Sequence, residues 1–242
     1  MKRPKGAQRF SVRPCDQKMI ELEKFRRGKF YDLIAGLPLI LWFGYGAWKL
    51  RPDLAADARA LLIEPGSLTA NLRFFALFAS VAFNILLIYL VVARTEPVRR
   101  ASGTLPRLCG FAGTFLGVGI LHLKPLTLSL SWQLIATALV FAGSLGSTIV
   151  LARLGKAFSI LPEARNLVTS GPYAFARHPL YAVEFLTLIG TAIQFAQPWA
   201  ALLALSVILL QVLRTVFEER VLADAYPEYA AYRARVKRFG FL

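Results

Sequence analysis

The sequence predicts an all-α, polytopic integral membrane protein: a bundle of about six transmembrane helices that ends in a helical hairpin. Two observations carry this prediction. Hydrophobic residues make up 56% of the 242-residue chain, whereas charged residues make up 18% and gather between long apolar runs. About 20 apolar residues cross the hydrocarbon core as a helix, and in lipid the backbone amides must be satisfied within that helix.

Six apolar runs mark the expected spans. The fifth is short, and only Gln197-Pro198 separates it from the sixth, which predicts a tight helical hairpin. Between the first two runs, Pro52 and Pro65-Gly66 predict a loop over 49–69 at the outer surface. Small residues at 142–148 predict close helix packing. The six runs are 31–48, 70–93, 107–123, 130–152, 180–196 and 198–217.

The basic residues predict the orientation and three regions of the chain. All but five of the 29 Lys and Arg residues fall in the tail 1–29, in loops 94–107 and 153–179, or beyond residue 213. The positive-inside rule therefore places both termini in the cytoplasm. We expect a basic tail over 1–29, membrane helices over 30–150 and a third region over 151–242 that holds the last two membrane helices and the C-terminal tail. The five exceptions are Lys49, Arg51, Arg59, Arg73 and Lys124.

Charge and cysteine content exclude several classes of function. The net charge of +15 does not predict nucleic-acid binding, because the basic residues lie between apolar runs and suit anionic lipid. Cys15 and Cys109 lie far apart without CxxC spacing, so neither a metal site nor a disulfide is predicted. The tail is longer and more basic than the start of a signal peptide, and we expect it to be retained.

A polar segment leads into the fifth run. Residues 167–186 read LVTSGPYAFARHPLYAVEFL. Pro179 suits the first turn of a helix, which puts His178 near its N-cap, where free N–H groups attract anions. Tyr181 and Glu184 follow at spacings of three on the same face. His178 and Tyr181 also suit a plain cap and an interfacial anchor. Glu184 does not, because an acid inside an apolar helix is costly and faces a partner or a polar cavity.

A second polar cluster closes the sixth run, LLQVLRTVFEERVL. Arg214 and Glu218 are four residues apart, so their side chains meet on one helical face. The hairpin brings this helix end beside the start of the fifth helix, which predicts one cytoplasmic corner holding both clusters. Amphipathic residues 227–239 would either cover that corner or lie on anionic lipid.

These motifs resemble the isoprenylcysteine carboxyl methyltransferase superfamily, which includes phospholipid methyltransferases, in its bacterial branch. The resemblance rests on GPYAFARHPLY, on RTVFEERVL and on the following EYAAYRARV, and it covers about residues 151–238. It implies a cytoplasm-facing pocket for S-adenosylmethionine at the membrane edge of a bacterial inner membrane. It implies these cofactor contacts: Leu167, Val168, Gly171, Tyr173, His178, Pro179, Tyr181, Glu218 and Glu219.

The resemblance also implies that Arg214 lies near the methyl acceptor, with Arg214 and Glu219 as candidate catalytic residues. A carboxylate acceptor, which we favour, would be oriented by Arg214 and would need no base. An amine or thiol acceptor must lose a proton, which makes Glu219 or Glu218 a candidate base. The acceptor is expected to be lipophilic or membrane-borne, and the sequence does not choose among these groups.

Three other functions compete with methyl transfer. A catalytically inactive membrane scaffold could keep the same fold, although the combination of His178, Arg214 and the paired glutamates argues against loss of activity. An NADPH-dependent membrane reductase is disfavoured, because such enzymes have more helices than this chain allows. A transporter would need broken helices and mid-helix acids, for which Glu184 is a weak candidate.

Overall fold

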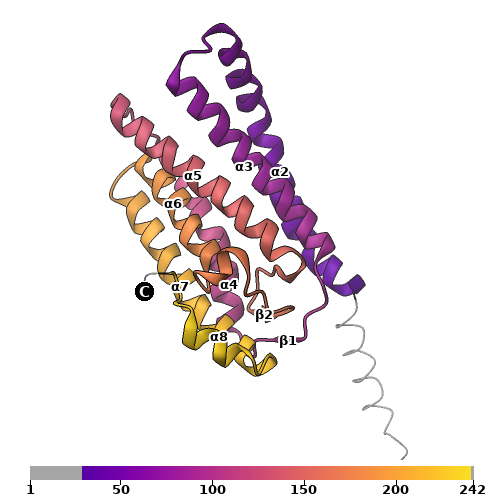
Figure 1. Cartoon of the computed structure of the whole chain (residues 1–242). Coiled ribbons are helices and arrows are strands. Elements are labelled where there is room, and N and C mark those ends of the chain that lie inside the picture. Colours follow the sequence, from indigo (N-terminus) through magenta and orange to yellow (C-terminus); the bar gives the residue numbers. More distant parts are fainter. Residues whose placement is uncertain (1–28, 241–242) are drawn as a thin grey trace, which may run out of the picture.

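The computed structural model describes residues 29–240, and a bundle of long helices makes up most of that part of the chain (Figure 1). The predicted tail, 1–29, lies outside the described residues except for Lys29, the first residue of α2. Short 3₁₀ segments and two tiny strands join the helices, so the fold is all-α, as predicted. The helices are α2 (Lys29–Ile63), α3 (Leu68–Ala93), α4 (Leu105–Phe115), α5 (Leu130–Leu154), α6 (Pro179–Ile193), α7 (Trp199–Ala225) and α8 (Tyr229–Arg235). The connecting elements are β1 (Arg99–Arg100), η1 (Leu116–His122), η2 (Gly155–Ala157), β2 (Glu163–Ala164) and η3 (Gly171–Ala174).

Four helices in residues 29–240 are long and apolar enough to cross a membrane, which makes the chain an integral membrane protein. They are α3, α4 continued by η1, α5 continued by η2, and α7. The prediction of six spans is thus confirmed for four. Helix α6 has 15 residues and is shorter than a full span, as its sequence indicated. The first predicted span, 31–48, lies within α2, but some side chains at the start of α2 are not described, and this span is not among the four.

The predicted outer loop over 49–69 is wrong for most of its length. Helix α2 continues through Pro52 to Ile63, and only four residues separate it from α3. The segment after Pro52 is DLAADARALLI, whose Ala, Leu and Arg residues favour helix strongly enough to outweigh one proline. Pro65-Gly66 does mark the turn, and Ser67 caps α3 by accepting a hydrogen bond from the Ala70 amide.

Close packing of α5 against α6 fixes the position of the hairpin. Gly143 of α5 touches α6 so closely that a Cβ there would lie 2.5 Å from the Thr187 amide nitrogen and 2.8 Å from the Val183 oxygen. Small residues at 142–148 therefore serve helix packing, as predicted. Helix α3 packs on the other side of α5, α2 packs on α3, and α4 packs against α7 (Figure 1).

One end of the bundle collects the polar connections. It holds β1, β2 and α8 beside the start of α6 and the end of α7, in the lower part of Figure 1. Strands β1 and β2 pair antiparallel, with Arg99 opposite Ala164, and Arg100 forms an ion pair with Glu163 at 3.1 Å. The basic loops predicted to share one side of the membrane thus lie at one end of the molecule.

Candidate functional site

The start of α6 brings the RHP motif to the polar end of the bundle. His178 is the N-cap residue and Pro179 occupies the first turn, as predicted. Proline fits there because its missing N–H would have no partner inside the helix. Upstream, Gly171 begins η3 with a φ of 63°, a conformation that costs glycine little. The turn that follows places Tyr173, His178 and α6 against α7.

The end of α7 supplies the second half of the site. Arg214 Nε donates to Glu218 Oε1 at 2.8 Å, which confirms the predicted i,i+4 contact, and Arg214 Nη2 donates to the Ser159 oxygen at 3.0 Å. Tyr181 of α6 donates its hydroxyl to the same Glu218 oxygen at 2.7 Å. The guanidinium also lies 5.3 Å from the Tyr181 ring centroid. Tyr181 and Glu218, which are 37 positions apart in the sequence, are thus joined by a hydrogen bond.

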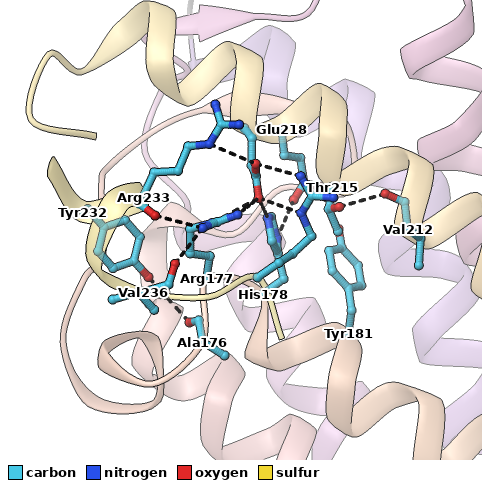
Figure 2. A network of polar contacts seen from close by, with 12 residues as sticks. Ala176, Arg177, His178, Tyr181, Val212, Thr215, Glu218, Tyr232, Arg233 and Val236 are labelled. Atoms are coloured by element: carbon cyan, nitrogen blue, oxygen red, sulfur yellow. Dashed lines mark hydrogen bonds and ion pairs between the residues drawn. The ribbon is translucent and has the colours of Figure 1, made fainter. Parts of the chain in front are cut away.

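Glu219 is the centre of an ion-pair network. Two of its partners, Arg177 and His178, are labelled in Figure 2. Its Oε1 accepts hydrogen bonds from Arg177 Nη2 at 3.0 Å, from His178 Nε2 at 3.2 Å and from Arg238 Nε at 2.9 Å. The other nitrogen of His178, Nδ1, lies 3.7 Å from Glu218 Oε2. The two glutamates therefore flank one imidazole. Glu219 is 4% exposed, and such a buried carboxylate is stabilised by these paired donors.

The C-terminal segment covers this corner, which was one of the two predicted alternatives for residues 227–239. The amides of Arg177 and His178 donate to the carbonyl oxygens of Lys237 and Arg238 at 3.0 and 2.8 Å. On α8, Tyr232 donates its hydroxyl to the Tyr173 oxygen at 2.6 Å, and burial raises the pKa of Tyr232 to about 12. The hydroxyl therefore stays protonated and keeps donating at neutral pH.

A cavity of about 420 Å³ opens beside the network. Its polar end is lined by Tyr173, Arg177, His178 and Arg214. The rest of its wall is largely apolar and comes from α3, α4, α5, α6 and α7, with Phe83, Leu87, Phe158, Leu188 and Val207 among the residues. Such a shape, polar at one end and apolar along its length, suits an amphiphilic ligand.

The predicted cofactor contacts differ in how close they lie to the cavity. Tyr173, His178 and Tyr181 line the cavity, and so does Arg214. Glu218 contacts Tyr181 and Arg214 at the same corner, and Glu219 lies behind His178. Leu167 packs instead on the cluster of Tyr229, Tyr232 and Val236 under α8. The remaining three, Val168, Gly171 and Pro179, belong to the same loop and helix start but do not line the cavity.

The chemistry of these side chains fits S-adenosylmethionine. Its amino acid carboxylate would suit the cationic and N–H donors at the polar end, Arg177 and His178 among them. Its ammonium and ribose hydroxyl groups would suit the Glu218 carboxylate. The faces of Tyr173 and Tyr181 suit a positively charged sulfur. The donor set therefore provides both charges that the cofactor needs.

Three further residues of the site were not predicted from the sequence. Arg238 binds both oxygens of Glu219, at 2.9 Å each, from the end of the chain. Ser159 provides the carbonyl for Arg214 from the loop after α5. Gln211 lines the cavity one turn before Arg214. Only Gln211 had a visible signal, because a polar residue inside an apolar helix indicates a partner or a cavity in the same way as Glu184.

Part of the chain is similar to proteins of a known family. Residues 132–229 match the family model described as phospholipid methyltransferase. The chain is 40% identical over 110 residues to the cobalt-zinc-cadmium resistance protein CzcN of Cupriavidus metallidurans. It is 34% identical over 110 residues to the nickel-cobalt-cadmium resistance protein NccN of Alcaligenes xylosoxydans xylosoxydans.

Each of these alignments covers 43% of this chain, and the chain spans about half the length of these curated relatives, 50% and 51%. The matched family region begins in α5, contains α6 and α7 with His178, Glu218 and Glu219, and ends at the first residue of α8, before Arg238. Residues 132–229 are therefore a phospholipid methyltransferase family domain, within the superfamily that includes the isoprenylcysteine carboxyl methyltransferases.

Proposed function

We propose that the protein is an integral-membrane methyltransferase that uses S-adenosylmethionine and acts on a lipophilic acceptor. One observation carries the proposal. The ends of α6 and α7 and the C-terminal segment meet at a polar corner, and a cavity runs from that corner into the apolar interior. A water-soluble donor and a membrane-borne acceptor could meet there. The family of residues 132–229 supports the same conclusion.

When bound, S-adenosylmethionine supplies a methyl group attached to a positively charged sulfur. The protein's part is to hold and orient the reacting groups and to exclude water. His178 and Arg177 bind the carboxylate of the cofactor at the polar end of the cavity. Glu218 accepts hydrogen bonds from its ammonium and ribose hydroxyl groups. Tyr181 holds Glu218 in place through its 2.7 Å hydrogen bond. The C-terminal segment closes the corner from solvent through its backbone bonds to Arg177 and His178.

The contacts favour a positioning role for Glu219. Its carboxylate already accepts hydrogen bonds from two guanidinium groups and one imidazole. Oxygens held in this way have little capacity left to take a proton, because the neighbouring positive charges favour the ionised form. We therefore assign Glu219 to the orientation of Arg177 and His178. Glu218 remains the glutamate for the cofactor, and its partner Arg214 lines the cavity.

Binding of S-adenosylhomocysteine to purified protein tests the proposal. Isothermal titration calorimetry in detergent should give saturable binding to the wild type. The chain has two histidines, which provide a matched pair of variants. His178→Ala should weaken binding at least about tenfold, because it removes a buried hydrogen-bonding group. His122→Ala should bind like the wild type, because His122 lies in η1, which follows the end of α4 that is remote from the polar corner.

The same titration separates the alternative functions. A folded wild type that does not bind S-adenosylhomocysteine would contradict the methyltransferase proposal and favour a scaffold. Binding of NADPH in its place would favour a reductase. The thermal unfolding midpoint of each sample reports whether it is folded.

The names of the two relatives favour a second proposal at the level of the cell. Both relatives are named as proteins of resistance to cobalt, cadmium and other metals. We propose that methyl transfer by this protein contributes to metal tolerance. A deletion strain should then grow less well in cobalt, and the wild-type chain should restore growth while His178→Ala does not. Equal growth of all three strains would contradict this role.

A further inference from the structure

We propose that Glu184 and Gln211 form, inside the cavity, the subsite that binds the polar group of the methyl acceptor, and that this group is a hydrogen-bond donor such as an alkylammonium. In turnover, which rests on the proposed function, the bound ammonium must first give one proton to the Glu184 carboxylate, which leaves the neutral amine with the lone pair that takes the methyl group. The binding preference can be tested without turnover. The proposal departs from the carboxylate acceptor that the sequence favoured.

Glu184 brings a carboxylate to the wall of the cavity. It lies on α6, about two turns from the N-cap His178, and it lines the cavity. In residues 29–240 its one hydrogen bond comes from Gln211 Nε2, which donates to Oε2 at 3.3 Å. The amide of Gln211 and the nearby charge of Arg214 offset only part of the cost of burying this carboxylate. Glu184 therefore retains oxygen lone pairs for a ligand that enters the cavity.

Gln211 adds a second acceptor at the same place. Its Nε2 lies between the Glu184 carboxylate and the Gly113 carbonyl oxygen, at 3.3 and 3.5 Å. Both neighbours are acceptors, which fixes the amide nitrogen on their side and turns Oε1 the other way. Oε1 is buried and has no hydrogen-bond partner within the described chain, and Gln211 is 8% exposed. A buried carbonyl without a donor is costly, and a ligand that donates a hydrogen bond removes that cost.

The surrounding groups favour a donor over an anion. Arg214 is already bonded to Glu218 and to the Ser159 carbonyl oxygen. Further along the wall, Ser147 contributes a hydroxyl oxygen without a partner among residues 29–240. An ammonium group would bring positive charge and up to three N–H donors to these oxygens. A carboxylate would lie beside the like charge of Glu184, which is unfavourable at low dielectric.

Packing alone does not account for the pair. An apolar pair of similar volume would stabilise two packed helices as well as a buried Glu–Gln contact does, or better. This pair instead borders an open cavity and leaves one acceptor unpaired. The acyl or alkyl part of the ligand would follow the apolar wall, where Leu188 and Val207 lie.

Calorimetry with three eight-carbon probes tests the proposal: octylamine, octanol and octanoate. All titrations use purified full-length protein at one detergent concentration, so the partition of each probe into micelles is the same for every variant. The wild type should bind octylamine about tenfold or more tightly than octanoate, because a charge-assisted hydrogen bond replaces repulsion. Octanol should fall between them.

Two nearly isosteric variants identify the subsite. Glu184→Gln should abolish the preference for octylamine over octanoate, and Gln211→Met should reduce it, while Glu64→Gln, in the exposed turn after α2, should leave it unchanged. Each variant must keep the wild-type affinity for S-adenosylhomocysteine, which shows that the rest of the site is folded. If the wild type prefers octanoate, or if Glu184→Gln keeps the amine preference, the inference is wrong. Failure of S-adenosylhomocysteine to bind the wild type would instead contradict the proposed function.

Discussion

At the scale of single residues, Glu219 connects three parts of the chain. Arg177 precedes α6, His178 caps it, and Arg238 lies in the segment that covers the corner. Each of these side chains donates to the same carboxylate. Removing that charge leaves two guanidinium groups close together without a counter-ion, and this arrangement is costly in a partly buried position.

Glu219→Gln should therefore lower the free energy of unfolding by about 2 to 3 kcal/mol. Unfolding in a titration with sodium dodecyl sulfate, followed by tryptophan fluorescence, measures this change. Glu64→Gln is the matched control, because Glu64 is an exposed acid in the turn between α2 and α3. A loss no larger than that of the control would show that the network does not support the fold.

Sequence reasoning found part of this site and missed part for a physical reason. It placed His178 at the N-cap and brought Arg214 to Glu218, because local helix geometry determines both contacts. It did not find the bonds from Arg177 and Arg238 to Glu219, which join residues 42 and 19 positions apart. Contacts of that kind depend on how the C-terminal segment folds back, and no local period in the sequence encodes it.

At the scale of helices, the contact between α5 and α6 determines where the site lies. Helix α6 is too short to be anchored by span length alone, so its packing on α5 must hold it. Gly143 allows this contact, because any side chain there would meet the α6 backbone. The sequence predicted packing at 142–148 from small residues, but the identity of the partner helix came from the structure.

Gly143→Ala should destabilise the protein by about 1 to 3 kcal/mol, because the added methyl group forces α5 and α6 apart. Gly44→Ala is a matched control on α2, where the new Cβ would lie 3.9 Å from Ile88 Cδ1, an ordinary contact distance. That variant should be neutral or slightly stabilising, because alanine favours helix more than glycine does. Thermal unfolding in detergent compares them, and equal stability of the two variants would contradict the packing account.

At the scale of the whole molecule, the long connections share one end of the bundle. The pairing of β1 with β2 joins the loop before α4 to the loop after α5, and Arg99 reaches Asp224 of α7 at 3.5 Å. These long-range links gather the basic loops where the polar corner lies. The distribution of charge alone predicted that these loops share one side. The predicted outer loop was too long, because helix propensity outweighed Pro52 and α2 continues to Ile63.

Cysteine labelling in cells tests the predicted orientation. Cys15 and Cys109 are first replaced by alanine, and single cysteines are then placed at the two ends of the bundle as Ser170→Cys and Glu64→Cys. A membrane-impermeant maleimide should label Glu64→Cys in intact spheroplasts, and Ser170→Cys only after permeabilisation, because the positive-inside rule places the basic loops in the cytoplasm. The reverse pattern would place the polar corner on the outer side, away from the cytoplasmic pool of S-adenosylmethionine.

The most direct test of the account is methyl transfer itself. Membranes that contain the wild-type chain are incubated with S-adenosylmethionine labelled in its methyl group, and the lipid extract is separated and counted. The account predicts a labelled lipophilic product that is lost in membranes with His178→Ala and retained with His122→Ala. Equal labelling in membranes with the wild-type chain and in membranes without it would contradict the account.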